Sequence, residues 1–179
     1  TIENTTFLNN YISIEKVNIS TLGGCFMASA QYIIINNITT KNNFAKRGGC
    51  IYIDKSINCT LNIKNSIFED NIGIDRGGAI YINSNIYNLF VLQLENIIFN
   101  NNNLLDENQQ IAGGAISIFT NTEFLIEINN SFFKSNNKKN EILGKYIFID
   151  NTFTFGNIYF YNNYFFNNNN NERLLINVK

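Results

Sequence analysis

Residues 61–82, LNIKNSIFEDNIGIDRGGAIYI, decide the fold because they hold two short motifs in a fixed order. The first motif is an aromatic residue, two residues and an asparagine, here Phe68 to Asn71. The second is two glycines, a small residue and an apolar strand, here Gly77-Gly78-Ala79-Ile80. The two motifs alternate along the chain, and this alternation predicts the architecture.

Copies of both motifs recur, with Thr40 in place of the aromatic residue in one of them. The glycine motif begins at Gly23, Gly48, Gly77 and Gly113. A degenerate copy begins at Gly144, where Lys145 replaces the second glycine. The aromatic motif ends at Asn10, Asn43, Asn71, Asn102, Asn136 and Asn169. A fixed order with variable spacing indicates the turns of a solenoid, with insertions confined to loops.

Apolar and polar residues alternate ahead of each aromatic motif, as in Leu61-Asn62-Ile63, which is the period of a half-buried strand. No helical period is visible, which argues against ankyrin and tetratricopeptide repeats. The sequence therefore predicts an all-β fold, a right-handed single-stranded parallel β-helix of about six coils. Residues 1–179 would form one domain. We expect residues 73–76 to be a short connection.

Alignment of the repeats places like residues above one another, at the strand spacing of about 4.8 Å. We expect one asparagine column to face the interior, where its amides would hydrogen-bond along the stack. Tyr159 and Tyr161 fit the same inward frame. The members of this column are Asn4, Asn37, Asn65, Asn96, Asn130 and Asn163.

Composition excludes several classes of function. The chain has 37 Asn and 30 Ile but no Pro, Trp or His, and its net charge is −1. With scattered charges and no basic face, we expect no nucleic-acid partner. No apolar run approaches the roughly 20 residues of a transmembrane helix, so we expect no transmembrane segment in this chain. The pattern begins and ends in mid-repeat, and we expect the chain to be part of a longer protein.

The pairing of Gly77-Gly78-Ala79-Ile80 with Phe68 to Asn71 resembles the repeat of the chlamydial polymorphic membrane proteins. It is also similar to the pectin-lyase-like β-helices of large ciliate surface proteins, the type that the asparagine excess favours. The resemblance spans essentially the whole chain and weakens at Thr40 and Gly144. It implies a β-helix in an extracellular or cell-surface protein, in its full length membrane-anchored, with structural or adhesive duties.

Cys25 and Cys50 occupy one repeat position on neighbouring coils, where Ala79 and Ala115 stand later. Their Cα atoms would lie about 4.8 Å apart, inside the window for a disulfide. A Cys25–Cys50 bridge is therefore a candidate; the alternatives are a pairing of Cys50 with Cys59, or cysteine as a small filler residue. With no His and three Cys, we expect no metal site, and no motif calls for a cofactor.

Glycosylation sequons occur at five asparagines. Asn4 and Asn37 belong to the column expected to face inward and would be inaccessible. The candidates for modification are then Asn18, Asn58 and Asn129, each weighed against chance matches in an Asn-rich chain.

Catalysis would require clustered carboxylates. Asp54 and Asp150 share a repeat position, but two other residues separate them, and Glu69 and Asp70 lie together on one coil. The stacked Arg47 and Arg76 are explained by surface ion pairing. We therefore expect no enzyme and no catalytic residue.

Tyr52 and Tyr81 stack on the outward side of the glycine strand, where they could form a ligand face. The leading hypothesis is a non-catalytic structural or adhesive segment whose partners are the rest of its own polypeptide or other surface proteins. The alternatives are a glycan-binding module, which would use such a face, and a degenerate polysaccharide lyase or hydrolase.

Overall fold

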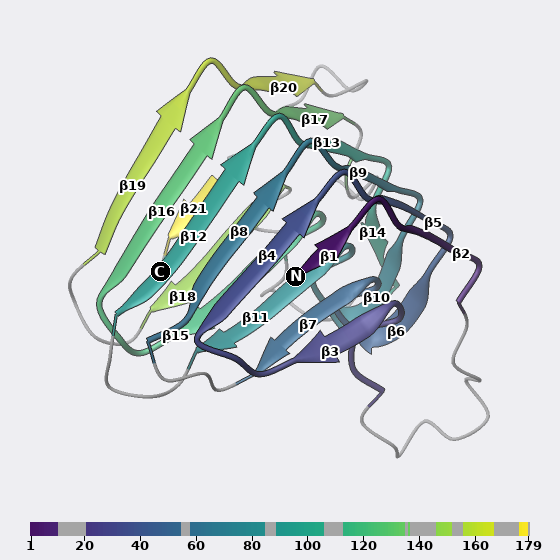
Figure 1. Cartoon of the computed structure of the whole chain (residues 1–179), viewed down its shortest axis with the longest axis horizontal. Helices are drawn as coiled ribbons and strands as arrows, with labels where there is room; N and C mark the ends of the chain where they lie inside the picture. Colours follow the sequence, from purple (N-terminus) through teal and green to yellow (C-terminus); the bar gives the residue numbers. More distant parts are fainter. Residues whose placement is uncertain are drawn as a thin grey trace.

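The computed structural model describes residues 1–10, 21–54, 58–84, 89–105, 113–134, 136, 146–151, 156–166 and 176–178. Within these ranges every regular element is a β-strand, and the strands form four parallel sheets (Figure 1). The chain is a parallel β-solenoid, as the repeats predict.

Sheets A and B hold six strands each. Sheet A consists of β1 (Ile2–Glu3), β4 (Tyr32–Asn36), β8 (Thr60–Lys64), β12 (Phe90–Glu95), β16 (Phe124–Asn129) and β19 (Gly156–Tyr161). Sheet B consists of β2 (Thr6–Leu8), β5 (Thr39–Lys41), β9 (Ile67–Glu69), β13 (Ile98–Asn100), β17 (Phe132–Lys134) and β20 (Tyr164–Phe166).

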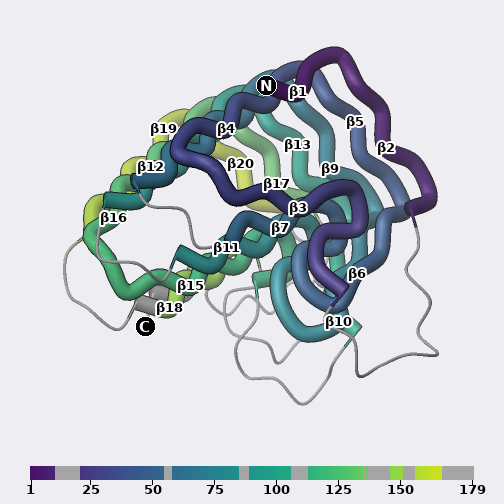
Figure 2. The backbone as a smooth tube through the Cα atoms, turned by 60° about the horizontal axis from the view of Figure 1, so that its bottom comes forward, coloured from purple at the N-terminus to yellow at the C-terminus, as the bar shows by residue number. Residues whose placement is uncertain are grey.

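Sheet C holds three strands and sheet D six. Sheet C consists of β6 (Phe44–Arg47), β10 (Ile72–Arg76) and β14 (Asn103–Leu104). Sheet D consists of β3 (Phe26–Ala28), β7 (Ile51–Asp54), β11 (Ile80–Ser84), β15 (Ile116–Thr120), β18 (Ile147–Asn151) and β21 (Ile176–Val178). Figure 2 shows sheets A, B and D around a common interior, with β6 and β10 in a lobe at the lower right.

Sheet C was not expected, since residues 73–76 were predicted to be a connection and lie instead in β10. Among the described residues, three consecutive turns contribute a strand to all four sheets, and Leu22 adds a single bridge to Arg47 in the first turn. The turns that pass through every sheet therefore number about four, slightly fewer than the six coils predicted.

The corners of the solenoid are made by residues with left-handed backbone. Asn65 (φ 50°) follows β8, Asp70 (φ 52°) follows β9, and Gly77 (φ 61°) follows β10. Asn and Gly tolerate this region better than other residues, because a short amide side chain or a missing Cβ avoids the steric clash. The asparagine excess and the glycine motif are therefore two solutions to the same geometric demand.

The second glycine of each motif answers a different demand. A Cβ on Gly49 would lie 2.6 Å from the backbone of Ile72, and on Gly78 it would lie 2.7 Å from the backbone nitrogen of Asn103. The carbonyl oxygen of the second glycine in the next turn lies closer still, at 2.1 Å for Gly49 and 2.0 Å for Gly78, so that between this oxygen and sheet C only glycine fits.

The interior consists of vertical files of identical side chains. Ile51, Ile80, Ile116 and Ile147 are paired in register on sheet D and are almost wholly buried. On sheet B the rings of Phe68 and Phe99 stack with centroids 5.0 Å apart, and Phe133 continues the file at 4.9 Å. Each fully buried side chain of this kind contributes about 1.5–3 kcal/mol, so the repeat itself builds the core.

Candidate functional site

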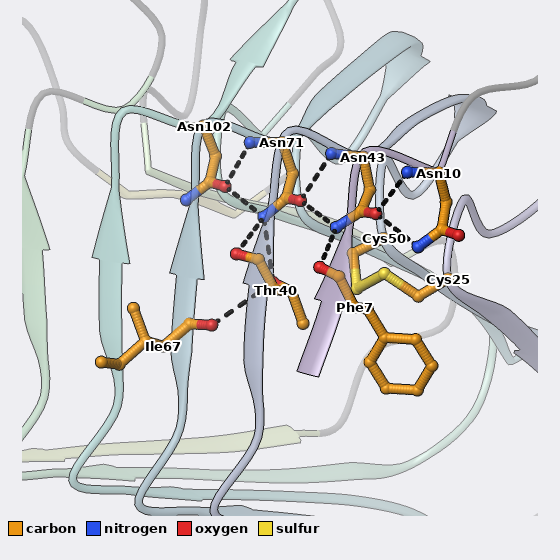
Figure 3. The surroundings of a disulfide bond; sticks show 9 residues. All are labelled: Phe7, Asn10, Cys25, Thr40, Asn43, Cys50, Ile67, Asn71 and Asn102. Carbon is orange, nitrogen blue, oxygen red and sulfur yellow. Dashed lines mark hydrogen bonds between the residues drawn. A yellow bond between two sulfur atoms is a disulfide. The ribbon is translucent and has the colours of Figure 1, made fainter. Parts of the chain in front are cut away.

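A buried ladder of asparagine amides joins consecutive turns at the corner between sheets B and C (Figure 3). The backbone N–H and the Nδ2 of Asn71 both donate to Oδ1 of Asn102, at 3.1 and 3.0 Å. Asn43 donates in the same way to Asn71, and Asn102 to Asn136. This is the column that ends the aromatic motif; its last copy, Asn169, lies outside the described residues.

The remaining amide hydrogens of the ladder are also satisfied. Asn43 Nδ2 donates to the carbonyl oxygen of Phe7, Asn102 Nδ2 to that of Phe68 and Asn136 Nδ2 to that of Phe99. Because all four of the buried asparagines are 0 % exposed, each unmade bond would cost about 1–3 kcal/mol. The arrangement offers no open polar group to a ligand, and its role is to hold the turns in register.

The column predicted to face inward does not do so. Asn4, Asn37, Asn65, Asn96 and Asn130 are all exposed and all have φ between 48° and 55°. Strict alternation of side-chain direction holds only while the backbone is extended. The left-handed residue at the corner interrupts it and turns the next residue inward, as at Ser66 and Ser131. These amides still bond along the stack, for example Asn96 Nδ2 to Asn65 Oδ1 at 3.0 Å, but they do so in water.

Asn163 does not belong to that column either. The left-handed corner in its turn is Asn162, and Asn163 is the inward residue that follows, with its Oδ1 2.9 Å from the backbone nitrogen of Ser131. The predicted frame was one residue out of register here. Ile158 and Phe160 pack against the core, while Tyr159 and Tyr161 face outward.

Cys25 and Cys50 form a disulfide across neighbouring turns, with Cα atoms 4.6 Å apart (Figure 3). This is the pair that the repeat position indicates. Cys59 is buried and takes no part in the bridge. The disulfide and the Asn10–Asn43 amide bond (2.8 Å) both link the first turn to the second.

Tyr52 and Tyr81 stack as predicted, with ring centroids 5.4 Å apart, but they do not form an open ligand face. They are 4 % and 2 % exposed, because at their turns the outward face of sheet D is covered as well as its inward face. The guanidinium groups of Arg47 and Arg76 lie 5.8 Å from the Tyr81 ring centroid, and the Tyr52 hydroxyl donates to Asp54 at 3.1 Å. Burial raises the pKa of Tyr52 to about 12.

The carboxylates considered for catalysis are engaged in pairs. Arg47, whose ion pairing was expected at the surface, donates from Nε to the almost buried Asp75 at 3.2 Å. Glu69 accepts from Lys41 at 2.8 Å, and this hydrogen bond holds the pKa of Glu69 below its usual value. Asn83 and Phe119 separate Asp54 from Asp150 in the register, as predicted. Among the described residues, no three Cys, Asp or Glu side chains gather into a metal site.

The exposure of the sequon asparagines in the structure differs from that expected from the sequence. Asn58 is exposed in a turn, and Asn4 and Asn37, predicted to be inaccessible, are exposed too. Asn129 lies on the outward side of its strand, in register with the exposed Tyr161, but its Oδ1 is buried without a hydrogen-bond partner and its sequon residue Ser131 is fully buried. Asn18 lies outside the described residues. The reversal at Asn4 and Asn37 follows from the same left-handed corners.

In the part of the chain that the structure describes, no helix is long and apolar enough to cross a membrane. The chain matches no family model, and no curated protein or solved structure is significantly similar to it.

Proposed function

We propose that this chain is a non-catalytic structural or adhesive segment of a secreted or membrane-anchored surface protein. The observation that carries the proposal is the Cys25–Cys50 disulfide between the first two turns. Disulfides persist in oxidising compartments and are rare in the cytosol. The proposal places the solenoid outside the cell, where a covalent link between turns protects an end of the stack.

The use of the side chains supports the structural part of the proposal. The inward residues form amide, isoleucine and phenylalanine files, and outward polar side chains pair between turns. Lys64 contacts Glu95 at 2.7 Å, and Gln93 Nε2 donates to Glu127 at 2.9 Å. Such pairs hold neighbouring turns together. These polar side chains therefore contribute to the stacking of the turns.

Surface labelling of the native full-length protein tests the localisation. Intact cells are treated with a membrane-impermeant biotin reagent, and the protein is recovered with an antibody raised against residues 1–179. We expect biotinylated protein, and mass spectrometry without reduction should yield a linked peptide containing Cys25 and Cys50. An unlabelled protein whose cysteines are both reduced in the cell contradicts the proposal.

N-glycan mapping provides a second readout. We expect occupancy at Asn58, whose side chain is exposed, and none at Asn129, whose sequon residue Ser131 is fully buried. Thr60→Ala removes the sequon of Asn58 and should remove the glycan there. The matched Asn129→Gln variant should leave the glycan pattern unchanged. Glycan at Asn129 and not at Asn58 would contradict the accessibility argument.

An enzyme is the competing function. Asp54 Oδ1 accepts from Tyr52 and Asn83, and Asp70 lies 3.7 Å from Lys41 Nζ, so both carboxylates are held in outward polar networks. We expect no turnover of polygalacturonate or alginate by the purified chain. Turnover that is lost in Asp54→Ala or Asp70→Ala would replace the structural proposal with a catalytic one.

A further inference from the structure

The last described turn carries an aromatic patch, defined as Tyr159, Tyr161, Tyr164 and Phe166, on its outward surface. Tyr159 and Tyr161 come from β19 and Tyr164 and Phe166 from β20, at the yellow-green end of sheets A and B in Figure 1. Their exposed fractions are 42, 54, 67 and 50 %. Four large aromatic side chains in water within eight residues are more than the scattered exposure of an ordinary surface.

On sheet A the neighbouring turns carry polar side chains in the columns where the patch carries tyrosine. Below Tyr159 its column holds Glu127, Gln93 and Asn62, and these polar side chains bond to one another along the stack. The Tyr161 column continues with Asn129 and Glu95. Aromatic residues thus replace the inter-turn polar contacts of the middle turns, and the stacking of the solenoid does not require them.

The rings of the patch lie in a row that runs from sheet A to sheet B. The rings of Tyr159 and Tyr161 are parallel within 7°, with centroids 6.3 Å apart, as expected of alternate residues on one strand. The left-handed Asn162 then turns the chain so that Tyr164 follows on sheet B, 6.5 Å from the ring of Phe132. Tyrosine combines an apolar ring with a polar hydroxyl, which suits a ligand that has apolar faces and a hydroxylated rim.

We propose that the aromatic patch binds a neutral glycan chain, an inference that rests on the proposed adhesive function and names its ligand class. Sugar rings present C–H faces that stack on aromatic rings, and their hydroxyls bond to carboxylates and amides. Glu127 adjoins Tyr159 in the register, accepts one hydrogen bond from Gln93 and keeps further acceptor capacity for hydroxyls. Its negative charge disfavours an acidic saccharide, which is the reason for a neutral ligand.

The test is binding of the purified chain to cellohexaose, chitohexaose and mannohexaose, with tri-galacturonate as the acidic comparison. The readout is isothermal titration, accompanied by thermal unfolding of each variant. We expect the wild type to bind at least one neutral oligosaccharide, and Tyr159→Ala/Tyr161→Ala to weaken that binding by about tenfold or more, at roughly 1.4 kcal/mol per factor of ten. Tyr32→Ala is the matched control, since Tyr32 is 74 % exposed on the same sheet but lies in the second turn.

Absence of binding to every neutral oligosaccharide overturns the inference, and so does binding that the double variant retains. A wild-type chain that dimerises in light scattering, with the dimer lost in the double variant, overturns it in favour of a second copy as the occupant. If the protein is at the cell surface but binds no glycan, this inference alone is contradicted. If the protein is absent from the surface, the proposed function is contradicted.

Discussion

Two rows of asparagine run along this solenoid, and they stabilise it for different reasons. In the inner row Asn43, Asn71, Asn102 and Asn136 are fully buried, and the amide of Asn71, for example, bonds to the turns on both sides. The outer row, which includes Asn65 and Asn96, is exposed and has left-handed backbone. The same residue at the same spacing thus serves as a buried hydrogen-bonding group in one row and as a permissive corner in the other.

The largest effect should come from breaking the inner row. Asn71→Leu leaves the backbone N–H and Nδ2 of Asn43 without their acceptor, whereas Asn102 Oδ1 loses the Nδ2 donor and keeps the backbone N–H of residue 71. At roughly 1–3 kcal/mol for each of the two orphaned donors of Asn43, we expect a loss of about 2–6 kcal/mol in the free energy of unfolding, measured in urea. Asn65→Leu is the comparison in the outer row, and an equal or larger loss there would contradict the distinction.

The disulfide permits a covalent comparison at the boundary that the Asn10–Asn43 bond also crosses. Cys25→Ala/Cys50→Ala places in both positions the residue that Ala79 and Ala115 supply in later turns. We expect a loss of about 2–4 kcal/mol, because the bridge restricts the unfolded chain. Reductant should lower the melting temperature of the wild type and leave that of the double variant unchanged; an insensitive wild type would show that the bridge does not form.

The outer row can be tested for its backbone role. Asn96→Val forces a β-branched residue into φ 55° and should cost roughly 1–2 kcal/mol, whereas Asn96→Gly removes the same amide without steric strain and should cost less. Urea unfolding of the two variants gives the order. A larger loss for glycine than for valine would mean that the exposed amide bonds, and not the left-handed backbone, determine the choice of residue.

The smallest effect is expected at the outward ion pairs. Lys64→Ala removes the 2.7 Å contact with Glu95, but both side chains are more than 40 % exposed. We expect a change of under about 1 kcal/mol in the free energy of unfolding, which high salt should reduce further. A loss as large as that of Asn71→Leu would mean that surface charges, and not the buried amides, hold the turns together.

Much of the fold could be predicted because the repeat marks the register directly. The pairing of Ile51 with Ile80 and Ile116, and of Tyr52 with Tyr81, follows from alignment of the glycine motif alone. The side on which a residue lies could not be predicted past a corner. A single left-handed residue shifts the alternation, which is why Asn65 was expected inside. Tyr159 and Tyr161, now part of the aromatic patch, were expected inside because their turn was aligned one residue out of register, and such a slip moves every side chain of a strand to the other face.

The sequence by itself determined that the chain winds into a parallel β-solenoid, that like residues stack in it, and that Cys25 lies beside Cys50. Periodicity carries that information, because each turn repeats its neighbour at one strand spacing. Tertiary structure decided what periodicity does not record: the addition of sheet C, the burial of Tyr52 and Tyr81 beneath the side chains around them, and the choice of the inner asparagine row. These depend on how the chain bends at its corners and which surfaces then meet, and both are set by contacts between residues far apart in the sequence.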